Sequence, residues 1–380
     1  MKGRVAVMTK HNADFEIREY PIPDVEPDAA LVKITRGGIC GSDLHIWRGE
    51  LQDAIGAPGR GQTFGHEMCG VVERLGPNVK TDSTGQLLAE GDRVTYCYFY
   101  PCGRCPACLD GFRATCPNKR RGTRYADDWP HFIGAYADYY YLRPGHFVYK
   151  VPPTISDDVA TPVNCALAQV LYGLEKVRVR VGDTVVMQGA GGLGLNASAV
   201  AKEMGAAQVI VIDQIPERLE LARRFGADHT VNLQDLPTPE DRVAAVKELT
   251  RGWGADIVCD FVGFPQVIPE GLQMLKSGGT YLEIGTISPP LKVELHPAQL
   301  VWGSKTIVGM IQYEPWAIQR ALIFLEQNLR KYPFAEVISH VYPLERISAA
   351  FREAEWLGRQ RDPHKVSRAA VAPWGKQGAP

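Results

Sequence analysis

The chain has 380 residues, of which 45% are hydrophobic and 22% charged, and its formal net charge is −1. This length and composition are typical of a soluble globular enzyme with two or three domains. Lys and Arg are scattered and nearly balanced by acidic residues, so the charge does not favour nucleic acid as a partner. No stretch reaches the roughly 18 apolar residues that a membrane helix needs, and no signal peptide is evident. We therefore expect a cytoplasmic protein without a nucleic-acid or membrane partner.

The first part of the chain is rich in short β-prone runs separated by Pro and Gly. Such punctuation predicts an irregular antiparallel region and not an alternation of strands and helices. The predicted strands are 3–7, 15–19, 30–35, 70–74, 92–96 and 136–142.

Four of the nine cysteines, Cys102, Cys105, Cys108 and Cys116, crowd into fifteen residues of the segment 97–118. Four thiolates at this spacing can surround one ion tetrahedrally with no open position, which describes a structural zinc. The alternative is a loop with incidental cysteines or disulfides, although adjacent C-x-x-C pairs would strain to form two separate bridges. We expect reduced cysteines and a zinc lobe here.

In a second region of the chain, which contains a glycine-rich turn, predicted strands and helices alternate. A predicted strand, 182–188, leads into the turn, and a predicted helix, 195–204, follows it. A second strand, 208–212, delivers an acidic residue. The candidate cofactor-binding residues are Gly189, Gly191, Gly192, Leu193, Gly194 and Asp213.

This context is that of a dinucleotide-binding turn. Glycines admit a pyrophosphate to the backbone, and the N-terminus of the helix supplies N–H donors. Asp213 can accept hydrogen bonds from the ribose hydroxyls and would repel a 2′-phosphate, with Gln214 and Ile215 offering no compensating cation. NAD is therefore expected in preference to NADP.

The alternation continues to the end of the second region and predicts about six parallel strands in a doubly wound sheet, an α/β Rossmann arrangement. Further helices are expected at 217–225, 242–250, 315–329 and 347–356, and further segments at 230–232, 256–262, 271–276, 280–284 and 306–310. The tail 369–380, rich in Ala, Gly and Pro, has no expected role.

A third pattern indicates a second metal site. Cys40 begins Cys-Gly-Ser-Asp-Leu-His, and His66 stands in Gly-His-Glu-Met-Cys-Gly, with a further glycine at Gly76. A catalytic zinc takes three protein ligands and leaves a fourth position open. These motifs, with the four-cysteine segment and the glycine-rich turn, resemble the zinc-dependent alcohol dehydrogenases of the medium-chain dehydrogenase/reductase superfamily over nearly the whole chain.

The resemblance implies a fold and a set of site residues. A β-rich, GroES-like catalytic domain would span 1–158 and 311–380, around a Rossmann domain at 159–310. Cys165 would be the third ligand of the catalytic zinc, a position where the family places Cys, Asp or Glu, and a buried structural cysteine is the alternative. Glu67 would be an exchanging ligand, and Ser42 and His45 would carry the alcohol proton to solvent. Two zinc ions per chain and a homodimer or homotetramer are expected.

The expected reaction is oxidation of a small-molecule alcohol to a ketone or aldehyde with hydride transfer to NAD. The family's geometry would line the substrate pocket from Trp47, the region after Cys116 and the segment around Trp302, and these aromatic residues suggest an apolar or medium-sized alcohol. Our preferred substrate is a secondary or cyclic alcohol. A polyol or amino-sugar alcohol is the next choice. Two different functions compete with this one: a zinc-free enone or quinone reductase that uses NADPH, and a non-catalytic relative with a binding or structural role.

Overall fold

The computed structural model describes residues 1–119, 125–288, 291–354 and 368–375. They form two compact units, and the predicted α/β class with a β-rich part is confirmed. Unit 1 comprises Met1–Ala168, Glu314–Leu329 and Phe334–Pro380, and unit 2 comprises Gln169–Tyr313 and Arg330–Pro333.

Unit 1 is built on β-sheets. A seven-stranded sheet runs in the order β14-β15-β3-β4-β5-β7, with β6 paired to β3, and a separate two-stranded sheet joins β1 to β2. Its strands are β1 (Lys2–Val7), β2 (Glu16–Pro21), β3 (Ala30–Gly38), β4 (Glu67–Leu75), β5 (Arg93–Tyr96), β6 (Tyr139–Leu142), β7 (Val148–Lys150), β14 (His340–Pro343) and β15 (Ala369–Ala372).

The helices of unit 1 are mostly short. They are α1 (Gly41–Arg48), α2 (Gln52–Ile55), α3 (Pro106–Leu109), α4 (Asp157–Ala160), α11 (Trp316–Asn328) and α12 (Ile347–Ala354). Single turns occur at η1 (Arg113–Thr115), η2 (Val163–Leu167), η3 (Phe334–Glu336) and η4 (Leu344–Arg346). The helix expected at 347–356 ends at Ala354 in the described chain, and its last two residues lie outside the described residues.

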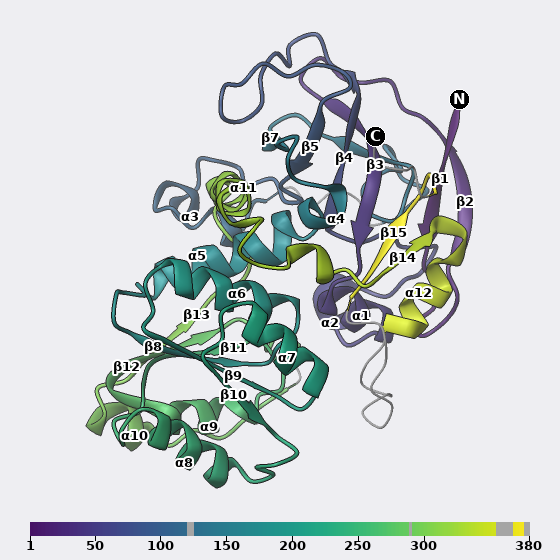
Figure 1. The fold of residues 1–380 in the computed structure, drawn as a ribbon. Coiled ribbons are helices and arrows are strands. Elements are labelled where there is room, and N and C mark those ends of the chain that lie inside the picture. The colour runs from purple at the N-terminus through teal and green to yellow at the C-terminus, as the bar shows by residue number, and fades with distance from the viewer. Residues whose placement is uncertain (120–124, 289–290, 355–367, 376–380) are drawn as a thin grey trace. The chain divides into compact units, whose positions relative to one another are not determined.

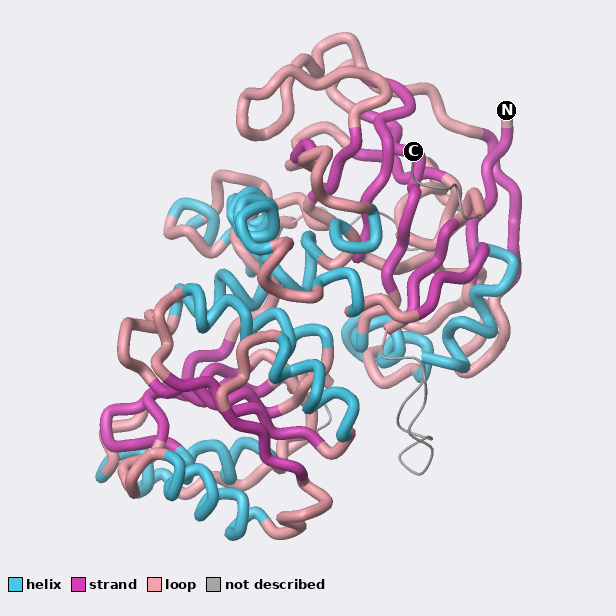
Figure 2. The backbone as a smooth tube through the Cα atoms, viewed as in Figure 1, coloured by secondary structure: helices cyan, strands magenta, loops and turns pink. Residues whose placement is uncertain are grey.

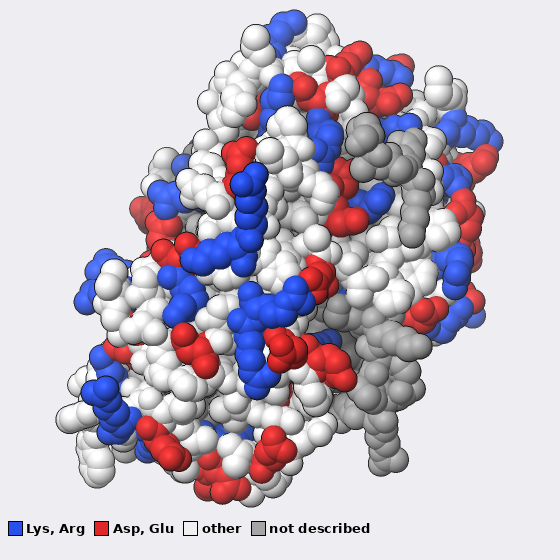
Figure 3. Space-filling view, viewed as in Figure 1, with Lys and Arg blue, Asp and Glu red and all other residues white. Residues whose placement is uncertain are grey.

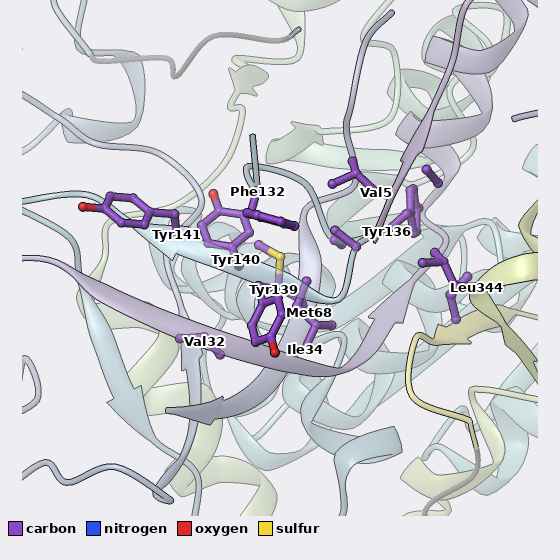
Figure 4. Packing of buried hydrophobic residues seen from close by; sticks show 14 of the residues in the cluster. Val5, Val32, Ile34, Met68, Phe132, Tyr136, Tyr139, Tyr140, Tyr141 and Leu344 are labelled. Carbon is purple, nitrogen blue, oxygen red and sulfur yellow. The ribbon is translucent and has the colours of Figure 1, made fainter. Parts of the chain in front are cut away.

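The core of unit 1 is aromatic and aliphatic. Figure 4 shows Val32 and Ile34 of β3, Met68 of β4 and the rings of Tyr139 and Tyr140 among the packed side chains. Successive residues of a strand point to opposite faces, so Val32 and Ile34 share one face of β3, while the adjacent Leu31, next to a register shift, is also part of this core. Burial of many such side chains, at about 25 cal/mol per Å² of apolar surface, is what holds the curved sheet together.

The expectation that 369–380 has no role is wrong for its described part. β15 is inserted between β14 and β3, pairing parallel with the first and antiparallel with the second. All four of its residues are buried. Its small Ala and Val side chains let it lie between two strands without displacing the core. Composition alone does not predict this strand.

Unit 2 contains the predicted six-stranded parallel sheet. Its strand order, β10-β9-β8-β11-β12-β13, is the doubly wound order 3-2-1-4-5-6 when the strands are counted along the chain. The strands are β8 (Thr184–Gln188), β9 (Gln208–Asp213), β10 (His229–Asn232), β11 (Ala255–Asp260), β12 (Leu275–Glu283) and β13 (Thr306–Gly309). The segment 271–276 divides between the end of α9 and the start of β12.

Helices cover both faces of this sheet. Figure 1 shows α6 and α7 on one face and α8, α9 and α10 on the other, and Figure 2 shows the strands as a continuous layer between them. The helices are α5 (Ala168–Lys176), α6 (Gly192–Glu203), α7 (Pro216–Arg224), α8 (Pro239–Leu249), α9 (Val267–Met274) and α10 (Pro297–Trp302). Coverage of both faces explains why β8 and β9 read as continuous apolar runs.

The surface carries both signs of charge. On the face drawn in Figure 3, Lys and Arg side chains are interspersed with Asp and Glu. Within the described ranges, no helix is long and apolar enough to span a bilayer.

Candidate functional site

Two groups of metal-ligating side chains stand out in the described part of the chain, and both lie in unit 1. One contains Cys40, His66, Glu67 and Cys165, and the other contains the four cysteines of 102–116. In each group, one ligand atom per residue lies within 4.8 Å of the others. The structure therefore brings together all the residues that the sequence analysis nominated as metal ligands.

Cys40 lies at the start of α1, after the last residue of β3. Its backbone N–H donates to Oδ2 of Asp43, at 2.9 Å, which fixes the turn into the helix. A thiol at a helix N-terminus is near the positive end of the helix dipole, which favours the thiolate that a metal requires.

His66 is held by the same carboxylate. Its Nδ1 lies 3.2 Å from Oδ1 of Asp43, and the hydroxyl of Tyr136 donates to Oδ2 at 2.8 Å. Asp43 is fully buried. A carboxylate on one imidazole nitrogen orients the ring and directs the other nitrogen to a metal. Asp43 therefore contacts both ligands, through the backbone of Cys40 and the ring of His66.

Cys165 reaches this group on a single π-helical turn, η2. The neighbouring Asn164 is fully buried and ties the turn to two strands. Its Oδ1 accepts from the backbone N–H of Met68, at 3.2 Å, and its Nδ2 donates to the carbonyl of Tyr96, at 2.8 Å. The sequence analysis missed Asn164, although a buried amide directly before a ligand cysteine is the available signal.

The side chains of this group shift one another's pKa values. A hydrogen bond from the Cys165 thiol, with help from His66, holds the pKa of Cys40 well below its ordinary value despite burial. The same hydrogen bond, with burial, raises the pKa of Cys165. Asp43 and Cys40 outweigh the effect of burial and raise the pKa of His66. Two sulfurs and an imidazole nitrogen this close together form a ligand set that a divalent cation can bind when the thiols are deprotonated.

Glu67 is fully buried beside the ligands. Burial raises the pKa of its carboxyl to about 7, although the positive charge of Arg368 opposes the rise. Its Oε1 accepts from Nη2 of Arg368, while Oε2 is buried without a hydrogen-bond partner. Oε2 of Glu67 is therefore available as a further ligand for a cation bound by Cys40, His66 and Cys165. Arg368 is a second residue that sequence reasoning missed.

The four-cysteine lobe has tetrahedral dimensions. Cys102 and Cys108 have their sulfurs 4.0 Å apart, and Cys105 and Cys116 have theirs 3.7 Å apart. Zn–S bonds of about 2.3 Å in a tetrahedron place sulfurs about 3.8 Å apart. All nine cysteines lie in the described ranges, and none of them forms a disulfide.

The pKa values of two thiols in this lobe are shifted in opposite directions. Backbone N–H groups of Arg104 and Cys105 lower the pKa of Cys102 to about 6. Burial and the neighbouring thiols raise the pKa of Cys108 to about 12. The four sulfurs together form the ligand set of a structural zinc site. Within the lobe, the backbone N–H of Arg113 donates to the buried carboxylate of Glu314, which anchors the lobe next to α11.

Ser42 and His45 lie three residues apart on α1, where i and i+3 side chains share a face. The Ser42 hydroxyl is 4.0 Å from Sγ of Cys40, so it lies at the edge of the candidate catalytic group. Trp47, expected in a substrate pocket, is buried in the core of unit 1 and packs on Phe351. Trp302 is 88% exposed.

The glycine-rich turn of unit 2 has the steric features of a phosphate-binding turn. Gly189 has φ 101°. A Cβ at Gly194 would lie 1.9 Å from the carbonyl oxygen of Gly189, so only glycine lets α6 approach β8 this closely. A Cβ at Gly191 would meet no atom within 4 Å, which leaves open space over the helix N-terminus.

Asp213 ends β9 beside this turn. Its Oδ2 accepts from the backbone N–H of Ala190, at 2.7 Å, and its Oδ1 accepts from that of Ile215, at 2.9 Å. Each carboxylate oxygen has a second lone pair for a ribose hydroxyl. Asp213 therefore both fixes the turn and is placed to meet a dinucleotide.

Comparison with known proteins decides the family. Residues 26–153 match the alcohol dehydrogenase GroES-like domain, and residues 192–327 match the zinc-binding dehydrogenase domain. The chain belongs to the zinc-dependent alcohol dehydrogenase family. The chain is 34% identical to 5-exo-hydroxycamphor dehydrogenase of Pseudomonas putida, covering 92% of this chain and 94% of that protein.

Other relatives of the chain differ in the substrate that their names give. An L-threonine 3-dehydrogenase of Bacillus subtilis is 31% identical, over 92% of this chain and 95% of its own. The crystal structure of an alcohol dehydrogenase from Thermotoga maritima has a TM-score of 0.87 at 29% identity, covering 98% of this chain and 99% of its own. The chain is thus an oxidoreductase of the zinc type, consistent with a nicotinamide cofactor and an alcohol substrate.

Proposed function

We propose that this chain oxidises a secondary or cyclic alcohol to a ketone, with NAD as hydride acceptor and two zinc ions per chain. The observation that carries the proposal is the convergence of Cys40, His66 and Cys165, from three separate segments, beside the buried Glu67. In this assignment Cys40, His66 and Cys165 would hold the catalytic zinc, and the buried Glu67 beside them would be a possible further ligand. The four-cysteine lobe holds the structural zinc.

Each part of the chain has a separate task in this reaction. Zinc supplies Lewis acidity to the alcohol oxygen, and the nicotinamide supplies the hydride acceptor. Asp43 keeps the His66 ring oriented, and Ser42 with His45 takes the alcohol proton toward solvent. Unit 1 is the catalytic domain, corresponding to 1–158 and 311–380 in the expected division, and the unit 2 sheet is the Rossmann domain of 159–310.

The cofactor assignment rests on Asp213. Its carboxylate is 8% exposed and lies next to the glycine-rich turn. A 2′-phosphate there would bring two like charges together, whereas two ribose hydroxyls would donate to the carboxylate. Gly189, Gly191, Gly192, Leu193 and Gly194 form the pyrophosphate-binding turn in this proposal.

The substrate class is supported by the names of the relatives. A hydroxycamphor carries its alcohol on a ring carbon, and the 3-hydroxyl of threonine is a secondary alcohol. Both are secondary alcohols, which favours that class over a primary one. A polyol or an amino-sugar alcohol is the alternative within the same chemistry. A homodimer or homotetramer in the cytoplasm completes the proposal.

The test is absorbance at 340 nm with zinc-loaded protein, NAD or NADP, and a panel containing 5-exo-hydroxycamphor, cyclohexanol, L-threonine, erythritol and 1-butanol. We expect turnover of a cyclic or other secondary alcohol with NAD. Cys40→Ala and His66→Ala should abolish turnover and retain NADH binding, whereas Cys259→Ala, a buried cysteine outside both groups, should keep both. Turnover that survives Cys40→Ala would contradict the catalytic site.

A further inference from the structure

His45 is the centre of a three-residue cluster at the end of α1. Its Nδ1 is hydrogen-bonded to Oε2 of Glu50, and Nη2 of Arg48 lies 3.2 Å from the same nitrogen. Arg48 also donates to both carboxylate oxygens of Glu50, from Nε to Oε1 and from Nη2 to Oε2, the latter at 3.1 Å. The side chains of His45 and Arg48 are 16% and 12% exposed and that of Glu50 is 34% exposed.

The backbone brings Glu50 back to the helix. Gly49 ends α1 with φ 84°, a left-handed conformation that glycine adopts without strain. The N–H of Glu50 then donates to the carbonyl of His45, at 3.0 Å. A Cβ at Gly49 would also lie 2.6 Å from Nδ1 of His11, so the tight turn requires glycine twice over. The reversal places the Glu50 carboxylate against a ring five residues earlier.

The Glu50 side chain is maintained as an anion. Burial raises its pKa, but hydrogen bonds from Arg48 and His45 outweigh burial and lower it overall. A bidentate arginine also fixes the plane of the carboxylate. Glu50 therefore presents an oriented acceptor to one nitrogen of His45 only.

A hydrogen-bond acceptor at Nδ1 of His45 fixes the tautomer of the neutral ring. With the proton held on Nδ1, Nε2 of the neutral ring carries the lone pair. A carboxylate that orients a histidine base is the usual third member of an acid–base system.

We propose that Glu50 is a positioning residue of the proton route: it holds His45 with its proton on Nδ1, so that Nε2 accepts the alcohol proton delivered through Ser42. Arg48 keeps Glu50 oriented for this task. The inference deepens the proposed function and depends on the Ser42–His45 route within it.

The first test measures the tautomer of the His45 imidazole and needs no substrate. In zinc-loaded protein with ¹⁵N-labelled histidine, the His45 signals are assigned by their loss in His45→Gln. We expect the neutral ring to be the Nδ1–H tautomer in the wild type and a mixture of tautomers in Glu50→Ala. Glu50→Gln keeps an amide oxygen as acceptor, so it should restore the Nδ1–H tautomer. Asp53→Ala removes an exposed carboxylate three residues away and should change nothing.

The second test measures kcat and KM with the alcohol of the panel that is oxidised fastest. Glu50→Ala should lower kcat roughly tenfold, less than the roughly hundredfold that a complete acid–base group contributes, with KM unchanged. Glu50→Gln should recover most of kcat. An unchanged His45 tautomer in Glu50→Ala, or an equal change in Asp53→Ala, would overturn the role of Glu50.

The two proposals fail in different ways. If His45→Gln retains wild-type kcat, the proton route in the proposed function is wrong, and the part of the Glu50 proposal that depends on it falls with it. If His45→Gln loses kcat but Glu50→Ala keeps both kcat and the Nδ1–H tautomer, the proton route survives and only the assignment of Glu50 is wrong.

Discussion

Arg368 donates a hydrogen bond from Nη2 to Oε1 of Glu67, across 301 residues of sequence. The Glu67 side chain is fully buried and that of Arg368 is 10% exposed. Arg368 directly precedes β15, and the pairing of Ala370 with Gly38 brings the guanidinium to the start of β4. The C-terminal segment therefore completes the environment of the candidate catalytic zinc.

Replacing Arg368 by Ala should destabilise the protein by about 3 kcal/mol or more, because the Glu67 carboxylate would stay buried without its ion-pair partner. Arg368→Lys keeps a positive charge and should lose less. The matched control is Arg346→Ala, whose side chain is 62% exposed in a surface ion pair and which should change stability by about 0.5 kcal/mol or less. Urea unfolding of the zinc-loaded protein measures all three. Equal effects of Arg368→Ala and Arg346→Ala would remove the structural importance assigned to this pair.

Asp213→Asn should shift cofactor preference toward NADP. The amide oxygen can still accept from the N–H of Ala190, so the glycine-rich turn stays in place while the charge that repels a 2′-phosphate is removed. We expect the ratio of NADPH to NADH affinity to rise about tenfold, which corresponds to about 1.4 kcal/mol. Fluorescence titration with each reduced cofactor measures this without a substrate. Asp183→Asn, before the amino end of β8, is the control, and a ratio that moves equally in both variants would count against Asp213.

Asp260→Asn should stabilise the protein above neutral pH. Burial, with the charge of Glu283 next to it in the sheet, raises the pKa of Asp260 to about 7. A carboxyl whose pKa is raised by folding favours the folded state while it is protonated, so this stability is complete below about pH 4 and is lost as pH rises through about 7. A tenfold change in the ionisation constant corresponds to about 1.4 kcal/mol.

Asparagine mimics the protonated carboxyl, since its oxygen can accept from the N–H of Val262, as Oδ1 of Asp260 does at 2.6 Å. Thermal unfolding at pH 5 and pH 8.5 should show that the advantage of Asp260→Asn over the wild type grows with pH. The exposed carboxylate of Asp235 provides the control, Asp235→Asn. An advantage that is the same at both pH values would show that Asp260 is ionised throughout.

Local patterns predicted much of this fold because they reflect local physics. The turn at Gly189 and Gly194 is required by backbone sterics that any sequence of this kind must obey, and the six-stranded sheet follows from apolar runs buried on both faces. The four cysteines of the lobe lie within fifteen residues, so their grouping needed no tertiary information.

Long-range partners were beyond the same reasoning. Arg368, Asn164 and Glu50 are ordinary polar residues in sequence, and their importance comes from what the fold places against them. β15 was missed because four small residues near the end of a chain carry no alternation. The contact of Asp43 with His66 likewise joins two separate segments of the chain.

The most direct test of the central claim is zinc content per chain by elemental analysis, in the wild type and in three cysteine variants purified identically. We predict about two zinc ions in the wild type and in Cys259→Ala, and about one in Cys165→Ala and in Cys108→Ala. Only Cys165→Ala should also lose turnover outright, because Cys108 belongs to the lobe. Two zinc ions retained in Cys165→Ala, or a wild type that holds only the lobe zinc, would contradict the assignment of a catalytic zinc to Cys40, His66 and Cys165.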